Sequence, residues 1–332
     1  MPQTGRQPAD PAEIDRAARL LRAGRLVAFP TETVYGLGAN ALDAEAVARI
    51  YAVKGRPGTS PLIVHVASIE MARSLVAGWP EIADRLARKF WPGPLTLVLE
   101  KQPAIPAIVT AGLSTVGLRM PAHPIALALI QAAGVPLAAP SANRFTELSP
   151  TTVDHVRRSL GADVDLILDG GPCRVGIEST VLSLAETGPT ETGRTERRPT
   201  LLRPGGISRT ELEAISGPVA AAPEIQARVH PAPGLHPRHY SPRTPLVLVM
   251  NGNLPDHGQG LYLQHQHPPS RTNVTFTIHQ MPQSALDYAA ALYDVLHLAD
   301  EGNYKWIAID IPPRTPAWEA VHDRLRRATS NP

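Results

Sequence analysis

Two cations in one short bend are well suited to bind phosphate. Lys54 and Arg56 flank Gly55 in the segment KGRPGTSPL, residues 54–62, and two chain breakers follow. A bend that presents two cationic side chains with free backbone N–H groups suits a polyphosphate. Taken alone, a segment of this kind is more often a solvated basic turn. The sequence has neither a Walker A loop nor a glycine-rich dinucleotide fingerprint after a strand, so phosphate binding would need a device of this kind.

Polar residues follow two apolar stretches that are typical of buried strands. The segment FPTETVYGLG, 29–38, places Thr33 among polar neighbours, and APSAN, 139–143, contains Ser141 and Asn143. Strand ends line the ligand crevice in open α/β sheets. The first segment could instead be a capped loop. A nucleophilic Ser141 would need a Gly-x-Ser-x-Gly elbow, which does not surround it, so hydrogen bonding to a ligand is the favoured role.

An arginine interrupts a further apolar strand. Arg119 lies within GLRMP, residues 117–121. A buried guanidinium needs an anion, which could be a partner carboxylate of the chain or the carboxylate of a substrate. The segment GIEST, 176–180, places Ser179 at the start of another strand.

The remaining candidate residues lie in the second half of the chain. Tyr240 belongs to APGLHPRHYSP, 232–242, a proline-rich segment whose basic and aromatic side chains indicate that it makes contacts. His265 and His267 could serve as metal ligands, but the sequence has no further set of candidate ligands nearby. Cys173 is the single cysteine, which excludes an intrachain disulfide and a cysteine-based zinc site.

Alternating strands and helices with short links must position these residues, and they predict an α/β fold on a twisted mixed sheet. The apolar periodicity predicts helices over 11–24, 44–53, 69–76, 80–90, 124–133, 151–160, 285–299 and 317–328. It predicts strands over 26–30, 61–66, 95–100, 115–121, 135–140, 164–171, 179–184, 246–250, 274–278 and 306–311. The polar segment 186–200 is expected to be a hairpin tip without chemistry.

The length of 332 residues and a hydrophobic fraction of 43% favour two domains with cores of their own. We expect a first domain over 1–212, a linker that also acts as a lid over 213–243, and a small βαβ, Rossmann-like domain over 244–332. The net charge of +2 argues against a dedicated polyanion binder. The start has no signal-peptide pattern and no apolar run is long enough to span a bilayer, which predicts a cytoplasmic protein.

Seven segments, in this order, resemble the YrdC-like family of threonylcarbamoyl-AMP synthases in its long, two-domain form. They are FPTETVYGLGANA, KGRPGTSPLIVHV, FWPGPLTLVL, TVGLRMP, PLAAPSANRFTELSPT, DGGPCRVGIESTV and LLRPGGIS. The segment 232–242 resembles the linker motif of the long form, and the end AVHDRLRRA looks like part of its accessory domain. Many relatives carry Asn where this chain has Ser60, and serine has the shorter side chain.

The resemblance implies a nucleotidyltransferase reaction. L-threonine, bicarbonate or CO2, and ATP would give L-threonylcarbamoyladenylate and pyrophosphate, which supplies the threonylcarbamoyladenosine modification of tRNA. Catalysis would rest on positioning and on neutralising charge, without a protein nucleophile. The implied partners are these substrates and the downstream tRNA threonylcarbamoyl-transfer machinery, and direct tRNA binding is left open. Mg²⁺ would be a cofactor that enters with ATP and has no protein side-chain ligand.

The resemblance also implies roles for individual residues. Lys54 and Arg56 would act as catalytic residues on the triphosphate. The ATP site would comprise Lys54, Arg56, Ser60, Thr115, Ser141, Asn143, Ser149, Arg203 and Tyr240. The L-threonine site would comprise Thr33, His65, Arg119, Ala139 and Ser179.

Two other hypotheses compete with this assignment. The first is an RNA-binding module, which the near-neutral charge and the scarcity of aromatic residues disfavour. The second keeps the nucleotide chemistry but changes the acceptor, as in a carbamoyltransferase partner domain.

Overall fold

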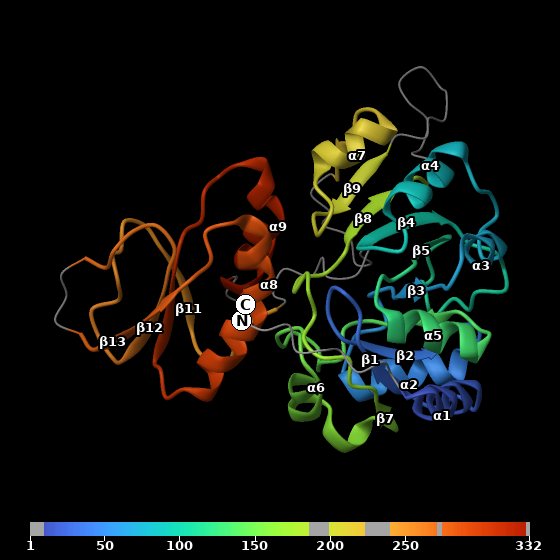
Figure 1. Ribbon diagram of the computed structural model, residues 1–332, viewed down its shortest axis with the longest axis horizontal. Helices are drawn as coiled ribbons and strands as arrows, with labels where there is room; N and C mark the ends of the chain where they lie inside the picture. Colours follow the sequence, from blue (N-terminus) through green and yellow to red (C-terminus); the bar gives the residue numbers. More distant parts are fainter. Residues whose placement is uncertain (1–9, 186–198, 223–239, 271–273, 330–332) are drawn as a thin grey trace.

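A computed structural model describes residues 10–185, 199–222, 240–270 and 274–329, which form two α/β domains (Figure 1). The first domain is built on a ten-stranded sheet of order β10-β9-β8-β4-β5-β3-β6-β2-β1-β7. Its strands are β1 (Val27–Phe29), β2 (Gly36–Asn40), β3 (Ile63–His65), β4 (Leu95–Glu100), β5 (Thr115–Arg119), β6 (Leu137–Ala138), β7 (Leu166–Ile167), β8 (Thr180–Ser183), β9 (Thr200–Arg203) and β10 (Ala220–Ala221).

This sheet is mixed, as the sequence predicts. The pairs β3–β5 and β4–β8 are parallel, whereas β4–β5, β3–β6 and β1–β2 are antiparallel. The helices of the domain are α1 (Pro11–Arg22), α2 (Ala44–Lys54), α3 (Ile69–Ser74), α4 (Glu81–Phe90), α5 (Pro124–Ala133), α6 (Val153–Ser159) and α7 (Arg209–Ser216), with a 3-10 turn η1 (Gly161–Asp163).

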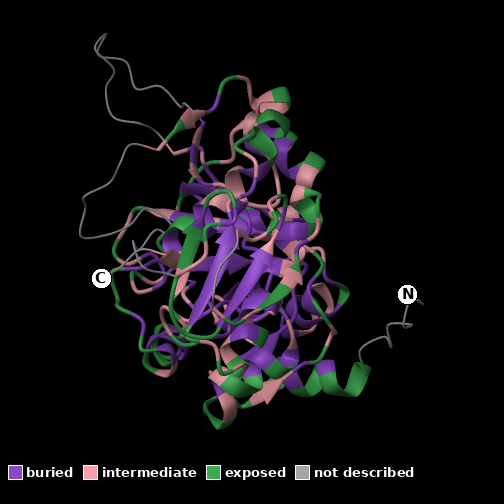
Figure 2. Cartoon of the chain, turned by 90° about the vertical axis from the view of Figure 1, so that its left-hand side faces the viewer, coloured by how far each residue is buried: buried purple, intermediate pink, exposed green. Residues whose placement is uncertain are grey.

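Helices cover both faces of this sheet, and the alternation of side chains along the strands divides the core into two layers. Val27 and Phe29 point to the layer formed with α1 and α5, whereas Leu26 and Ala28 point to the larger layer on the opposite face. Figure 2 shows that the buried residues gather in the interior of the molecule and that the exposed residues lie at its periphery. The fold therefore needs apolar residues at every position of short strands such as β1, and VAF supplies them.

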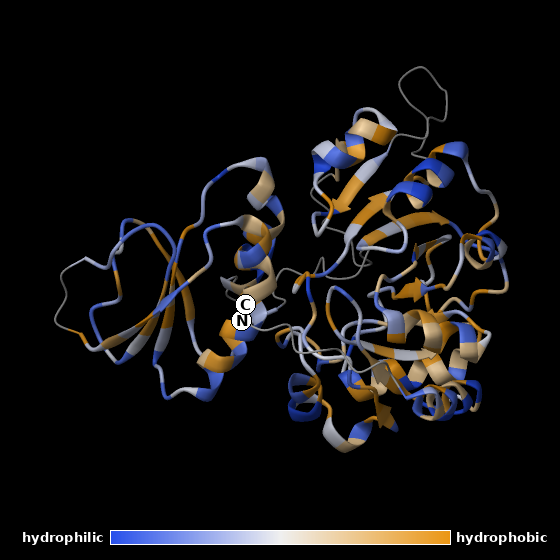
Figure 3. Ribbon diagram, viewed as in Figure 1, coloured by the Kyte–Doolittle hydropathy of each residue, from blue (hydrophilic) through white to orange (hydrophobic). Residues whose placement is uncertain are grey.

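The second domain has a four-stranded parallel sheet of order β11-β14-β12-β13. Its elements are β11 (Leu246–Val249), β12 (Gly260–Gln264), β13 (Phe276–Gln280), α8 (Ala285–Glu301), β14 (Trp306–Asp310), η2 (Pro316–Trp318) and α9 (Glu319–Thr329). Helices α8 and α9 lie between this sheet and the first domain in Figure 1. The apolar face of the small sheet packs on these helices, as the orange segments of Figure 3 indicate.

Most of the predicted elements are confirmed within a few residues, and the missed ones have weak local signals. Strand β2 contains two glycines, which are depleted in strands, and it forms because β1 and β6 pair with it on both sides. Strand β12 lies in a segment rich in breakers and is completed by β13 and β14. Helix α7 and strand β10 extend the first domain to residue 221, inside the segment assigned to the linker.

Several sequence-based expectations fall on residues outside the described part of the chain. They are the hairpin tip at 186–198 and the linker residues 223–239. The division into 1–212, 213–243 and 244–332 stays a prediction. In the described part of the chain, no helix combines the length and the apolar character that crossing a membrane requires.

The two domains contact each other through closely packed and charged groups. Gly176 has φ of +72°, and a Cβ at this position would lie 2.5 Å from the Cα of Ala290 in α8, so glycine permits this close approach. Arg209 forms an ion pair with Glu319 at 3.3 Å across the same interface. The His155 ring of α6 stacks on His297 of α8, with 3.7 Å between ring centroids.

This histidine contact predicts acid sensitivity. Burial, with help from neighbouring His297, lowers the pKa of His155 to about 3, although Asp294 Oδ1 lies 3.7 Å from its Nε2. An unfolded histidine has a pKa of about 6.5, so between about pH 6.5 and 3 the unfolded chain binds a proton that the folded chain excludes. The free energy of unfolding should therefore fall as pH decreases through this window, by about 2 kcal/mol at pH 5 from this residue.

Chemical denaturation of the whole protein at pH 7.5 and pH 5 measures this effect. The variant His155→Gln removes the titrating group, so its loss of stability between the two pH values should be smaller by about 2 kcal/mol. An identical loss in both proteins would contradict the assignment.

Candidate active site

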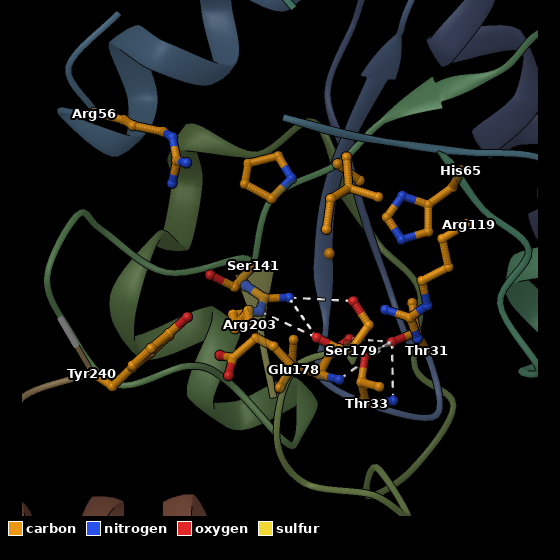
Figure 4. Close-up of a pocket in the computed structure, with 15 residues that line it drawn as sticks. Thr31, Thr33, Arg56, His65, Arg119, Ser141, Glu178, Ser179, Arg203 and Tyr240 are labelled. Carbon is orange, nitrogen blue, oxygen red and sulfur yellow. Dashed lines mark hydrogen bonds between the residues drawn. The ribbon is translucent and has the colours of Figure 1, made fainter. Parts of the chain in front are cut away.

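One cavity of the first domain collects polar residues from several strand ends, and its volume is about 520 Å³, which includes space open to solvent (Figure 4). Its lining comprises Thr31, Thr33, Val34, Gly36, Arg56, Ile63, His65, Arg119, Ala139, Pro140, Ser141, Glu178, Ser179, Arg203 and Tyr240. Nine of these fifteen are residues that the family resemblance places in the ATP or threonine sites. In Figure 4, Arg56 and Tyr240 lie on one side of the cavity, and His65 and Arg119 lie on the opposite side.

Sheet register brings these residues together. His65 and Arg119 end the parallel strands β3 and β5 and are paired in register. Ala139 continues from β6, and its N–H donates to the carbonyl oxygen of Ile63 at 2.9 Å. A β-bridge joins Gly36 to Ser141. The cavity therefore forms where adjacent strands of a mixed sheet end, as expected for ligand sites in such folds.

Arg119 is held by a carboxylate of the chain. Its Nη2 donates to Glu32 Oε1 at 2.7 Å, and Glu32 Oε2 accepts the N–H of Ala122 at 2.9 Å. Both side chains are almost completely buried. Within the described residues, Arg119 Nε has no hydrogen-bond partner although it is buried. A fixed guanidinium with a donor left over can bind a second anion on the cavity side.

Burial keeps the neighbouring imidazole neutral. His65 is 4% exposed, and burial together with the nearby Arg119 charge lowers the pKa of His65 to about 3. The imidazole therefore contributes hydrogen bonding without a second positive charge. This leaves Arg119 as the cation on its side of the cavity, among the residues that the structure describes.

The opposite side carries two further guanidinium groups. Arg56 donates from Nη2 to Ser60 Oγ at 2.5 Å and to the carbonyl oxygen of Pro61 at 3.1 Å. Burial lowers the pKa of Arg56 to about 10, so it remains charged at neutral pH. Arg203 donates from Nε and Nη2 to the carbonyl oxygen of Ser179, at 3.1 and 3.0 Å. Ser179 Oγ also lies 2.8 Å from Thr96 Oγ1.

Lys54 takes a different position from the one that the sequence suggests. Its ammonium donates to the carbonyl oxygens of Ser141, at 2.6 Å, and Asn143. Lys54 is 2% exposed and is not one of the described residues that line the cavity. Burial, followed by the charge of Arg56, holds the pKa of Lys54 well below its ordinary value. The lysine thus fixes the backbone that carries Ser141, and contact with phosphate stays a prediction.

Four other candidates also lie behind or outside the cavity wall. Ser60 Oγ accepts from Arg56, and Asn143 Nδ2 donates to the carbonyl oxygens of two neighbouring loop residues. Ser149 Oγ donates to Glu178 Oε1 at 2.6 Å. Thr115 lines a separate small cavity, together with residues of β3, β4 and β8. These four residues, which the resemblance assigns to the ATP site, therefore do not line this cavity.

Sequence reasoning missed six lining residues, which are Thr31, Val34, Gly36, Ile63, Pro140 and Glu178. Each of them adjoins a predicted residue or lies two or three positions from one, so the strand ends that were recognised carried their signal. Glu178 precedes Ser179 in the recognised GIEST segment, but its carboxylate had no stated role.

The described residues offer no cluster that could hold a metal ion. No group of three or more His, Cys, Asp or Glu side chains gathers in that part of the chain. His267 Nδ1 lies 2.9 Å from Asp310 Oδ1, in the second domain. Glu178 is the carboxylate of the cavity lining, and it is already engaged by Ser149, Tyr293 and Arg324.

A cavity with guanidinium groups on opposite sides and hydroxyls between them suits the binding of an anionic small molecule at two points. Residues 19–205 match a family model of the Sua5, YciO and YrdC proteins described as "Telomere recombination". Residues 207–330 match the model "Threonylcarbamoyl-AMP synthase, C-terminal domain". The chain belongs to the Sua5/YciO/YrdC family, in its long two-domain form.

Individual relatives agree with this assignment. The chain is 42% identical over 332 residues to a threonylcarbamoyl-AMP synthase of Bacillus subtilis, covering 95% of this chain and 92% of that protein. It is 48% identical over 236 residues to the enzyme of that name from Pyrococcus abyssi, covering 70% and 66% of the two chains. A crystal structure of P. abyssi Sua5 complexed with L-threonine superposes with a TM-score of 0.86 at 38% identity, covering 98% and 96%.

Proposed function

We propose that this chain is a nucleotidyltransferase that makes L-threonylcarbamoyladenylate and pyrophosphate from L-threonine, bicarbonate or CO2, and ATP. The supporting observation is the single cavity in which Arg56 and Arg119 lie on opposite sides, in a chain whose full-length relatives carry the name of that enzyme. A solved relative with 38% identity was crystallised with L-threonine. The two guanidinium groups provide one anchor for a triphosphate and one for an amino-acid carboxylate.

The chemistry needs positioning more than a reactive side chain. The threonine amine and CO2 form a carbamate with loss of a proton, and a carbamate oxygen then attacks the α-phosphorus of ATP. The bond from the α-phosphorus to the bridging oxygen breaks, and pyrophosphate leaves with its electron pair. Arg56 and Arg203 would neutralise charge on the nucleotide side, and Arg119 would hold the carboxylate so that the carbamate faces the phosphorus.

Individual assignments follow the two sides of the cavity. We assign the L-threonine site to Thr33, His65, Arg119, Ala139 and Ser179, and the cavity-facing part of the ATP site to Arg56, Ser141, Arg203 and Tyr240. Mg²⁺ would arrive bound to the phosphates of ATP. Tyr240, which is 1% exposed, would close the nucleotide side against water and so protect the labile carbamate and mixed anhydride. The product would pass to the machinery that modifies tRNA.

Pyrophosphate release tests the proposal directly. The purified full chain is incubated with ATP and Mg²⁺, with and without L-threonine and bicarbonate. Release should require all components, and omission of threonine should reduce it to the background rate. Release that is independent of threonine would refute the reaction and would favour a nucleotide hydrolase.

The two competing hypotheses receive no specific support. The relatives carry the name of a threonylcarbamoyl-AMP synthase, so the RNA-binding alternative gains nothing from them. An RNA-binding module would show an affinity for RNA that falls steeply with salt. Filter binding at two salt concentrations distinguishes it from the enzyme.

A further inference from the structure

A completely buried arginine of the second domain reaches the wall of the catalytic cavity. Arg324 of α9 is 0% exposed, and its Nε donates to Glu178 Oε2 at 2.7 Å. Its Nη2 donates to the carbonyl oxygen of Pro204, next to Arg203, at 3.1 Å. Asp323 Oδ2 accepts from Nη1 at 2.7 Å and holds the guanidinium from its own helix. The side chain is therefore fixed at both ends.

The same guanidinium supports Tyr240. Its central carbon lies 5.3 Å from the centroid of the Tyr240 ring, within the range of a cation–π contact. The ring of Tyr293 in α8 also packs against the Tyr240 ring, with 5.8 Å between the two centroids. The Tyr293 hydroxyl donates to Glu178 Oε2 at 3.2 Å. Two helices of the second domain thus fix two residues, Glu178 and Tyr240, that line the cavity of the first.

The electrostatic consequence concerns the triphosphate. Burial alone would raise the pKa of Glu178, but the charges of Arg324 and Arg203 hold the pKa below its ordinary value, so the carboxylate stays ionised. An ionised carboxylate in the cavity wall would repel a polyanion if nothing compensated its charge. Arg324 supplies that compensation from behind the wall, together with the charge of Arg203, which lines the cavity.

We infer that Arg324 is a positioning residue through which the second domain sets the affinity of the cavity for ATP, by neutralising Glu178 and fixing Tyr240. This inference rests on the proposed function. Helix α9 would then contribute to nucleotide binding as well as anchoring the linker. In Figure 4, His65 and Arg119 lie across the cavity from Tyr240, so the part of the threonine site that they form should be little affected.

Steady-state kinetics of the full-length variant Arg324→Met test the inference. We expect KM for ATP to rise at least tenfold while KM for threonine changes less than twofold. A calorimetric titration with ATP alone should show the same loss of affinity. The control is Arg209→Met, which removes another interdomain ion pair, with Glu319, without touching Glu178 or Tyr240. Its KM for ATP should stay within twofold of the parent value.

Two further variants separate positioning from folding. Loss of Arg324 leaves a buried carboxylate unpaired, which is strongly destabilising, whereas replacing both partners is tolerated better. The double variant Glu178→Gln/Arg324→Met should therefore fold and recover part of the ATP affinity, and Arg324→Lys should have an intermediate KM. Equal changes in both KM values, an unchanged KM for ATP, or loss of folding in all three variants would overturn the inference.

The outcome is independent of whether the reaction is correctly assigned. If the parent protein binds ATP but releases no pyrophosphate with all substrates, the proposed function fails. The titration with ATP still reports on Arg324 in that case. If the parent is active and Arg324→Met binds ATP normally, the inference alone fails.

Discussion

Replacing Arg119 by Ala should abolish threonine use while leaving ATP binding nearly intact. The expected fall in kcat/KM for threonine is roughly 100- to 1000-fold, or about 3–4 kcal/mol, the size of effect seen when one partner of a buried charge pair is removed. Arg119 lines the cavity opposite Arg56, so affinity for ATP in the absence of threonine should change less than about threefold. Kinetics with threonine varied and a titration with ATP provide the two measurements.

The ion pair of Arg119 with Glu32 requires a matched control. The Ala variant leaves Glu32 buried without its partner at 2.7 Å, which could distort the cavity by itself. The double variant Glu32→Gln/Arg119→Met removes both charges, so it should regain stability but not threonine use. Equal losses in threonine use and ATP binding would show that the guanidinium supports the cavity as a whole and does not clamp the carboxylate.

The sequence predicted this pair only in part, for a physical reason. An arginine within the apolar strand β5 needs an anion, and that requirement can be stated from residue types alone. The identity of the anion depends on Glu32, which is 87 positions away along the chain and comes close because the loop after β1 passes the end of β5. Such long-range pairing follows from sheet topology, which local periodicity does not determine. The sequence therefore predicted that the anion is a carboxylate of the chain or of a substrate, and the structure shows Glu32 as the carboxylate of the chain.

The same distinction applies to the rest of the site. Thr33, His65, Ala139 and Ser179 were placed correctly in the cavity because strand ends and family segments identify them locally. Glu178 was missed because its surroundings include Arg324, which belongs to another domain. The sequence did not predict that Lys54 bonds to the carbonyl oxygens of Ser141 and Asn143. Every residue has a backbone carbonyl, so residue types do not indicate which carbonyls accept a hydrogen bond.

Replacing Lys54 by Met should lower both stability and ATP use. The substitution removes the donor from two carbonyl oxygens, of Ser141 and Asn143, and an unsatisfied buried acceptor costs about 1–3 kcal/mol. The loop that carries Ser141 into the cavity would shift, so kcat/KM for ATP should fall roughly 100-fold. The control Lys101→Met removes another lysine that donates to a carbonyl, that of Ile105, away from the cavity, and should leave ATP use unchanged.

Proton uptake distinguishes a structural lysine from one that also contacts phosphate. The pKa of Lys54 is held well below its ordinary value by burial, and a phosphate oxygen close to the ammonium would raise it again. ATP binding at mildly alkaline pH should then take up a proton, which calorimetry detects as a heat that varies with the ionisation enthalpy of the buffer. Arg56 stays charged throughout this range and adds no such signal. Heats that are independent of the buffer would mean that Lys54 stays on its two carbonyls and that Arg56 and Arg203 hold the triphosphate without it.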